Sequence, residues 1–549
     1  MLDKKYLLWV SICILLLFPL FDLFHPGLPI THDGQDHVAR IANFYQSLTE
    51  GTVVPRWAAN LNWGYGHPIL MFLYPLPSYL ASFFHFFGFS FIDSLKVVFG
   101  LAFIASGITM YVWIKEMLGQ EEGLIAGALY MYAPYRFVDL YVRGAIGEHV
   151  AFVFPPLIFY FFLKLSKRYS YWYVVFGSLS VAGLILSHNA ITLMFLPFML
   201  FYAGYLCWIH RDKRKQIVLS YCSIIVLGFG ISAFFLIPAF FEGKYTLRDI
   251  VTKGEYQNRF VTSVSDFIYG VWNYGGTGKF SVQVGILQWA SVFFALPTAI
   301  VLKKKKRDII VLVTLCIAFW FVLFLMTTAS KPIWEIITTM QKFQFPWRLL
   351  SLTVFITAVI GAFCISFLTK KIKTFILFLS IFLILFLNRE YWHANGYMYK
   401  DDQFFKNIYF GTTDTGESAP IWSVRFMEQP PKSRTEIIGG EATVSEHKRT
   451  STEHVYEIDV LTDKAQIREN TLYFPGWVVK VDNKPTIVEF QSQVNRGVMT
   501  FFLEKGKHIV TVQFLETKLR FIANVISIAS LATLLFSDIL RRKLWQRFR

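Results

Sequence analysis

The sequence is poor in charge and in cysteine, and each shortage excludes a class of protein. Only 16% of the 549 residues are charged whereas 54% are hydrophobic, a balance that excludes a set of ordinary soluble domains. The five cysteines lie in apolar runs without CxxC spacing, so neither a disulfide framework nor a cysteine-held metal is expected. The sequence also lacks a Walker motif and a nucleotide-binding glycine-rich loop, which disfavours a nucleotide-linked donor.

Long apolar runs take the place of those features. Runs near the about 18–20 residues that a membrane-spanning helix needs recur along the chain. The first, from residue 7 to about 23, is not followed by a small-residue cleavage site, so we expect a retained helix. Several of the runs are flanked by basic clusters, at residues 164–168, 211–215, 303–307, 370–373 and 541–549.

These clusters predict the orientation. The positive-inside rule places them, and both termini, in the cytoplasm of a multi-pass plasma-membrane protein. The net charge of +16 therefore needs no nucleic-acid partner, although the lysine run before Arg307 is also compatible with a lipid or nucleic-acid patch.

The chain is outside after the first helix and must be inside at the basic cluster near residue 164, so it crosses the membrane an odd number of times between them. Four apolar runs lie in this stretch: 69–88, 95–114, 122–134 and 150–163. One run therefore does not span. We choose 69–88, because Pro68, Pro75 and Pro77 interrupt it, and keep the short run 122–134 as the rival. About 12–13 transmembrane helices remain, with outer segments at 25–94, 134–149, 188–190, 239–285, 327–347 and 389–518.

The last outer segment differs from the others. From Glu436 onward it alternates β-branched and polar residues, with turn signals at Asp482-Asn483 and Lys505-Gly506. This pattern predicts a small extracytoplasmic β-sandwich. The predicted organisation is a polytopic α-helical domain over 1–388, a β-rich domain over 389–518, and a last helix with a basic tail over 519–549.

The first outer segment holds the densest group of ionisable residues, in the sequence THDGQDHVAR. Asp33, Asp36, His37 and Arg40 fall within ten residues there, followed by PRW and NWGYGHP. A carboxylate near a low-dielectric boundary can act as a general base, and two carboxylates can hold a hard divalent cation. Ordinary loop polarity is the alternative.

Two further outer segments carry charge at helix ends. The segment APYRFVDLYVRGAIGEHVAF crowds Arg143 and Glu148 together, and either a functional site or internal pairs Arg143–Glu148 or Arg136–Asp139 would explain it. The segment QFPWR places Trp347 and Arg348 at the start of a helix, as an interfacial anchor or a phosphate-binding group. His188 lies in a short outer turn.

Together these segments resemble the GT-C superfamily of polytopic glycosyltransferases. The second outer segment is similar to a motif of oligosaccharyltransferase catalytic subunits, although the usual Asp before the second acid is missing. The DxxxH spacing of Asp33 and His37, then PRW, GYGHP, PYRFxDLYxRGAxxE and QFPWR, resembles more closely the bacterial membrane family labelled 6-pyruvoyl-tetrahydropterin synthase-related (PTPS-related). The His triad of the soluble zinc enzyme is not visible. The segment TLYFPGWVVKVDNKP resembles the outer β-domain of YfhO-like proteins.

The resemblance implies transfer of a sugar from a polyprenyl-phosphate donor to a cell-envelope glycan or lipid on the outer face, with inversion. Asp33 would be the general base, oriented by Asp36 or His37. The implied donor-phosphate ligands are Arg143, Arg348, Arg40, Arg56 and His188, and the implied substrate-binding residues are Trp57, Tyr65, Glu148 and Trp347. No cofactor is expected; Mg or Mn remains possible, with Asp33 and Glu148 as ligands.

Other readings stay open. The aromatic residues Trp422, Tyr473 and Trp477 of the outer domain would either bind an acceptor glycan or form its core. A transporter or flippase, or a non-catalytic scaffold for envelope assembly, is the alternative function. A transporter is disfavoured because charges gather on one face and no internal repeat is visible. The expected partners are the donor, the acceptor and membrane lipids, and no nucleic acid is expected.

Overall fold

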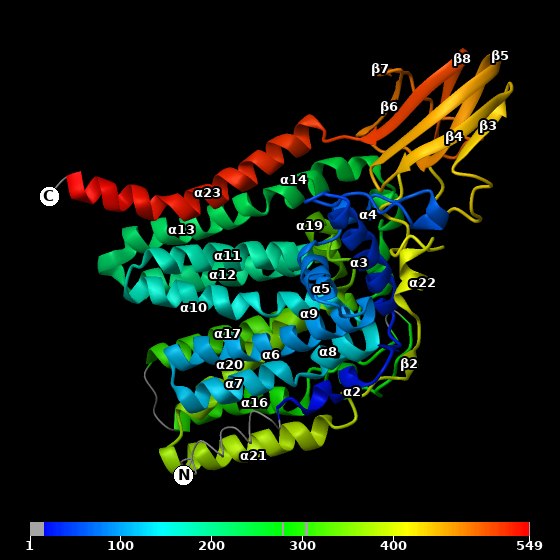
Figure 1. Cartoon of the computed structure of the whole chain (residues 1–549). Helices are drawn as coiled ribbons and strands as arrows, with labels where there is room; N and C mark the ends of the chain where they lie inside the picture. Colours follow the sequence, from blue (N-terminus) through cyan, green and yellow to red (C-terminus); the bar gives the residue numbers. More distant parts are fainter. Residues whose placement is uncertain (1–15, 277–278, 302–305, 548–549) are drawn as a thin grey trace.

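The computed structural model describes residues 16–276, 279–301 and 306–547, and shows a helical bundle with a β-sheet domain projecting beyond one end (Figure 1). Among these residues, eight helices are long and apolar enough to cross a membrane. They are α6 (Phe91–Met117), α9 with α10 (Ile146–Ala151 and Phe154–Lys167), α12 (Asn189–Ile209), α13 (Arg214–Ile231), α17 (Lys306–Leu325), α20 (Leu350–Ser366), α21 (Lys370–Asn388) and α23 (Lys518–Arg547).

Two shorter apolar helices, α11 (Tyr171–Ser187) and α16 (Ile286–Val301), also belong to the described bundle, as does the 12-residue helix α7 (Gln120–Met131). The helix expected from residue 7 lies largely outside the described residues. The remaining short helices gather at the end of the bundle next to the sheet: α2 (Phe21–Phe24), α3 (Gly34–Thr49), α4 (Ile69–Phe72), α5 (Leu76–Phe86), α8 (Pro134–Phe137), α14 (Ala233–Phe241), α15 (Arg248–Val251), α18 (Lys331–Ile336), α19 (Thr338–Gln341) and α22 (Asp402–Lys406).

The two ends of the bundle differ in charge. At one end, Lys167 pairs with Glu116 of α6 at 2.8 Å, and Lys213 donates to the carbonyl of Lys167. These contacts join the α6–α7, α10–α11 and α12–α13 turns, and the start of α21 joins them through the pair Lys373–Glu122. We call this the basic end, and the opposite end the sheet end.

The segment 69–88 does not run along the bundle. It forms the short helices α4 and α5, which are separated at the extended residue Leu73 and at Pro75, the N-cap of α5, and α5 packs on α3 and α6 at the sheet end. The rival segment forms α7, which lies along α21: Glu122 pairs with Lys373 near one end, and Asn388 donates to the carbonyl of Tyr132 at the other. The interruption by prolines was thus the informative signal.

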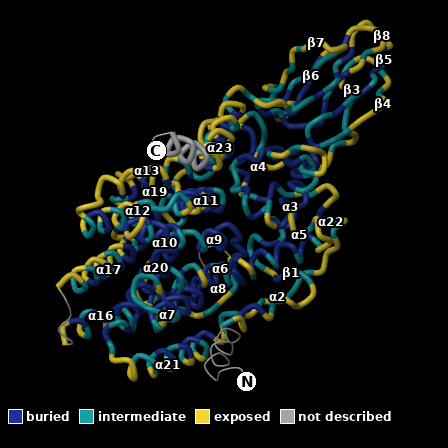
Figure 2. The backbone as a smooth tube through the Cα atoms, turned by 60° about the vertical axis from the view of Figure 1, so that its left-hand side comes forward, coloured by how far each residue is buried: buried dark blue, intermediate teal, exposed yellow. Residues whose placement is uncertain are grey.

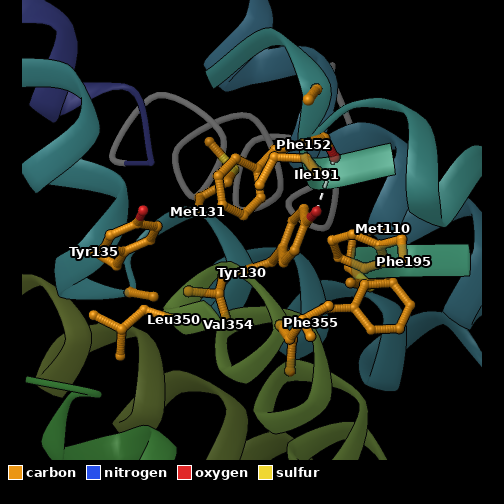
Figure 3. Close-up of a cluster of buried hydrophobic side chains, with 14 of the residues drawn as sticks. Met110, Tyr130, Met131, Tyr135, Phe152, Ile191, Phe195, Leu350, Val354 and Phe355 are labelled. Atoms are coloured by element: carbon orange, nitrogen blue, oxygen red, sulfur yellow. Dashed lines mark hydrogen bonds between the residues drawn. The ribbon is translucent and has the colours of Figure 1, made fainter. Parts of the chain in front are cut away.

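Helix α20 forms the centre of the bundle. In the most apolar 18-residue stretch of α20, 89% of the residues are buried. The corresponding share is 22% for α21 and 17% for α23, which lie at the periphery (Figure 2). Figure 3 shows the packing around Tyr130 of α7, whose hydroxyl donates to the carbonyl of Phe152 at 2.8 Å. Leu350, Val354 and Phe355 of α20 approach from the opposite side (Figure 3). This core lies directly beneath the sheet-end loops.

The sheet domain is a single six-stranded antiparallel sheet, where two facing sheets were expected. Its order is β3-β5-β8-β6-β7, with β4 also paired to β5. The strands are β3 (Thr435–Gly439), β4 (Ala442–Arg449), β5 (Glu453–Leu472), β6 (Trp477–Val481), β7 (Lys484–Pro485) and β8 (Val498–Phe514).

Two long strands account for the difference. The pattern predicted several short strands, but β5 and β8 run for 20 and 17 residues. The turn at Asp482-Asn483 forms, with φ of 48° and 65°, but the one at Lys505-Gly506 does not. β8 continues through these two residues. The irregularity lies in β5, where the residues between Val460 and Lys464 leave the regular pairing with β8.

The sheet domain is fastened to the first loop. β1 (Leu28–Pro29) pairs with β2 (Tyr397–Met398), and Trp57, Tyr65 and Met71 share the hydrophobic core of the large sheet. Residues 399–434, which we call the linking segment, run between β2 and β3. The sheet therefore holds the loop that precedes α4.

Candidate functional site

The candidate site begins where the first two loops of the sheet end are joined by their backbones. The amide of His32 donates to the carbonyl of Val142 at 3.0 Å, and the amide of Asp33 donates to that of Arg143 at 2.9 Å. Gly144 follows in the left-handed conformation, with φ of 68°, and a Cβ there would lie 2.3 Å from Oγ1 of Thr31. Only glycine allows this close approach, which fixes Asp33 beside Arg143.

Asp33 precedes the first turn of α3 and leaves its carboxylate free. Its side chain makes no capping hydrogen bond, and within the described ranges it has neither a hydrogen bond nor an ion pair with another side chain. The residue is half-buried. An unpaired carboxylate held by its own backbone can accept a proton from an incoming hydroxyl.

Asp36, His37 and Arg40 occupy the next turns of α3. Asp36 accepts a 2.7 Å hydrogen bond from the Tyr409 hydroxyl, and burial raises the pKa of Asp36 although Arg40 opposes the shift. Burial, reinforced by Arg40, holds the pKa of His37 well below its usual range, so the imidazole is neutral at pH 7. Arg40 donates through Nη2 to the carbonyl of Thr413 at 2.7 Å.

Glu148 is the centre of a buried ionic cluster. Its Oε1 accepts from Nη2 of Arg143 and from Nε of Arg348, each at 2.7 Å, and its Oε2 accepts from the Tyr135 hydroxyl at 2.8 Å. Arg143 also pairs with Asp139 at 2.7 Å. The predicted pair Arg143–Glu148 therefore forms. Arg143, and not Arg136, is the partner of Asp139.

Arg136 lies apart from this cluster, in an aromatic environment. Its guanidinium lies 4.0 Å from the ring centroid of Phe152, and Nη2 donates to Ser106. His149 is likewise buried between aromatic rings, those of Phe99 and Phe103. Both residues belong to the core beneath the site.

Trp347 and Arg348 are parts of the cluster. Trp347 is only 2% exposed, and the Arg143 guanidinium lies 4.7 Å from its ring centroid, so it is not an interfacial anchor. Arg348 uses Nε for Glu148 and Nη1 for the carbonyl of Phe343. Its Nη2 has no hydrogen-bond partner in the part of the chain that the structure describes, and is available to an anion.

His188 and Tyr74 complete the group. Nε2 of His188 lies 3.9 Å from Glu148, while Nδ1 accepts from the amide of Ile191. Burial lowers the pKa of His188 to about 3, so the ring is neutral and Nε2 carries a proton. The Tyr74 ring packs 4.9 Å from His188 and against Gly147, where a Cβ would lie 2.1 Å from the ring.

Sequence reasoning missed Tyr74, Tyr135 and Tyr409. Tyr74 lies between the two loops, since Arg40, Asp33, Glu148 and Arg348 all influence its pKa, which burial raises to about 12. Its position at the break between α4 and α5, inside the segment 69–88, was the only sequence signal. Tyr135 stands in the motif PYRFxDLYxRGAxxE but was given no role, and Tyr409 had no signal, because each acts through a contact made by the fold.

Three predicted site residues lie elsewhere. Arg56 donates to Glu516 at 3.0 Å, to Asn524 at 2.9 Å and to the carbonyl of Phe234, so its guanidinium holds α23. Trp57 and Tyr65 belong to the core of the sheet domain. Trp477 is 3% exposed and packs on Trp57, which agrees with the core interpretation of that residue.

Tyr473 and Trp422 also pack on other aromatic rings. The rings of Tyr473 and Phe490 stack 3.6 Å apart, and Trp422 packs edge-on to Tyr473.

The residues at the site do not suit a cation. Both oxygens of Glu148 face donors, two of them guanidinium groups, which leaves Asp33 as one unpaired carboxylate. Within residues 16–276, 279–301 and 306–547, no three His, Cys, Asp or Glu side chains are grouped to hold a metal ion. The proposed ligand pair Asp33 and Glu148 therefore does not fit a divalent ion in this arrangement.

Comparison with protein families identifies the chain. Residues 70–393 match a family model described as "6-pyruvoyl-tetrahydropterin synthase related domain; membrane protein". The chain belongs to this family. An uncharacterized protein of Lactococcus lactis subsp. cremoris (strain MG1363) is 30% identical over 246 residues, which cover 42% of this chain and 39% of that protein.

Two solved structures of glycosyltransferases align with the chain. Arabinofuranosyltransferase AftD from Mycobacteria shows 12% identity and a TM-score of 0.42, over 70% of this chain and 28% of AftD. The oligosaccharyltransferase of Archaeoglobus fulgidus shows 13% identity and a TM-score of 0.42, over 76% of this chain and 61% of that enzyme.

Proposed function

We propose that the protein is an inverting membrane glycosyltransferase. It moves a sugar from a polyprenyl-phosphate-linked donor to a hydroxyl group of a glycan or lipid. The acceptor oxygen forms a bond to the anomeric carbon, the bond from that carbon to the phosphate oxygen breaks, and the acceptor proton passes to the carboxylate of Asp33. The polyprenyl phosphate leaves. The observation that carries the proposal is the free carboxylate of Asp33, fixed by its backbone beside Arg143.

The groups around Asp33 supply what a leaving phosphate needs. Nη2 of Arg348 and the proton on Nε2 of His188 are free to donate hydrogen bonds. Nε of Arg40 is buried without a hydrogen-bond partner among the described residues. Preformed donors of this kind stabilise charge that develops in the transition state. Arg143 is saturated by Glu148 and Asp139, so its role is to hold the cluster and to carry the backbone contact with Asp33.

The charge difference between the ends supports the orientation. Because basic loops remain on the cytoplasmic side, the basic end faces the cytoplasm, and the site and the sheet domain lie outside. The reaction then takes place at the outer surface of the membrane, where a lipid-linked sugar is available and nucleotide-linked sugars are not.

The test uses purified full-length protein and synthetic polyprenyl-phosphate sugars carrying a radiolabel. Transfer of label to a hydroxyl acceptor, with release of polyprenyl phosphate, is the expected result. Folded protein that consumes no donor across a broad panel of sugars and acceptors would contradict the proposal and favour a transporter or a scaffold.

A further inference from the structure

A groove of about 720 Å³ opens at the basic end, far from the candidate site. It lies between α11, α13 and α23, which pack side by side (Figure 1). Its polar lining includes Tyr171, Asp212, Lys213 and Lys215, and its apolar lining includes Val174, Leu219, Leu227 and Leu534.

The length of the groove matches one membrane leaflet. Along α13, Lys215, Leu219, Ser223 and Leu227 recur every four residues and form one stripe. The stripe is about 18 Å long at a rise of about 1.5 Å per residue. The hydrocarbon core of a bilayer is about 30 Å thick, so the groove runs from the basic surface to about the middle of the membrane.

The mouth of the groove is complementary to an anion. In the turn before α13 and at the start of that helix, four basic residues face one acid, Asp212: Arg211, Lys213, Arg214 and Lys215. Lys215 has no ion pair with any side chain described in residues 16–276, 279–301 and 306–536, and Lys213 makes a single bond, 3.4 Å long, to the carbonyl of Lys167. The hydroxyl oxygen of Tyr171 is buried and lacks a hydrogen-bond partner among the described residues.

We propose that this groove binds one anionic diacyl phospholipid of the leaflet at the basic end. The phosphate lies at Lys213 and Lys215 and accepts from the Tyr171 hydroxyl, and the acyl chains lie along the stripe on α13 and against Leu534 of α23. A basic pocket between membrane helices that continues into an apolar wall is suited to such a lipid. The lipid would fasten the peripheral helix α23 to α13, because both line the groove.

The test measures lipid retained by the full-length protein in native mass spectrometry. The probes are phosphatidylglycerol and phosphatidylcholine with identical acyl chains. We expect wild type to prefer phosphatidylglycerol at least tenfold. Lys213→Gln/Lys215→Gln should lower its affinity about 25-fold, at about fivefold for each lysine near the surface. Both lysines are exposed, so this variant keeps its fold.

Three matched variants distinguish a built site from general attraction. Lys370→Gln/Lys371→Gln removes the same charge from α21 and should retain phosphatidylglycerol. Ser223→Trp fills the groove without changing charge and should lose it. Asp212→Asn should bind it equally well or more tightly.

Equal binding of the two lipids by wild type, or undiminished binding by Ser223→Trp, would overturn the proposal. Equal losses from the two lysine pairs would also overturn it. Weaker binding by Asp212→Asn would indicate a lipid with an ammonium group and contradict the anionic assignment.

Discussion

The hydroxyl of Tyr409 donates a 2.7 Å hydrogen bond to Oδ1 of Asp36. This bond joins the linking segment to α3, the helix that begins just after Asp33. The carbonyl of Thr413 strengthens the same attachment, since it accepts from Arg40. The linking segment that leads into the sheet domain therefore positions α3, although it contributes none of the ionic cluster around Glu148.

The raised pKa of Asp36 predicts a pH-dependent stability. Burial disfavours the charged carboxylate, so the folded state binds this proton more tightly than the unfolded chain. The stabilisation that protonated Asp36 gives the folded state is fully present below the pKa of Asp36 in the unfolded chain. It is lost as the pH rises through the pKa of Asp36 in the folded protein. Asp36→Asn should therefore unfold at a higher temperature than wild type at pH 7, and this advantage should vanish near pH 3.5.

Thermal unfolding in detergent between pH 3.5 and 7.5 checks this prediction. Asp249→Asn, which changes an exposed carboxylate, is the control and should follow wild type. A difference between Asp36→Asn and wild type that is constant over the pH range would show that Asp36 does not titrate in this way.

Glu148 is expected to be essential for stability. Glu148→Gln leaves two buried arginines without their shared anion, and breaking a buried ion pair costs about 3–5 kcal/mol. The melting temperature and the yield of folded protein should fall clearly. Glu116→Gln, in a partly exposed pair at the basic end, should cost about 0–1 kcal/mol. Equal losses for the two variants would refute the structural role of the cluster.

Arg56 and Arg348 should behave differently, because only Arg348 lies at the site. Arg56→Lys loses contacts to α23 and should lower stability without changing the KM for the donor. Arg348→Lys loses the free Nη2 donor and should raise the donor KM about tenfold, since lysine cannot reproduce the guanidinium fork. Steady-state kinetics with purified variants separates the two. A raised donor KM in Arg56→Lys alone would reverse the assignment.

Chelation of metals should leave transfer unchanged, because Glu148 is held by guanidinium groups and Asp33 is a single free carboxylate. Initial rates with EDTA, and after addition of Mg²⁺ or Mn²⁺, give the answer. Activity that disappears with EDTA and returns with one of these ions would require the cluster to rearrange around a cation.

The sequence predicted the bundle better than it predicted the site. Apolar run length and the prolines at 69–88 are local signals. They located the bundle, in which eight described helices can cross a membrane where 12–13 were expected, and the segment that does not run along it. The orientation that the basic flanks predict stays a prediction. The proximity of Arg143, Arg348 and Glu148 was also anticipated, because all lie at helix ends on one side of the bundle. Arg56 looked equivalent to them by charge and position.

What sequence reasoning could not supply were the partners made by tertiary contacts. Arg56 does not join the other arginines at the site, because its guanidinium binds Glu516 and Asn524. Both lie more than 450 residues further along the chain. Tyr409 binds Asp36, which lies 373 residues away in the sequence. The turn predicted at Lys505-Gly506 does not form, because β8 continues there and pairs irregularly with β5. Neither effect has a local pattern.

The most direct measurement compares Asp33→Asn with wild type in single-turnover transfer from a polyprenyl-phosphate sugar. The substitution keeps the size and the backbone contact to Arg143, so folding and donor binding should persist. Loss of the general base should slow transfer at least about 100-fold, with Asp249→Asn at the wild-type rate. Transfer by Asp33→Asn at the wild-type rate would contradict the assignment of Asp33 as the base.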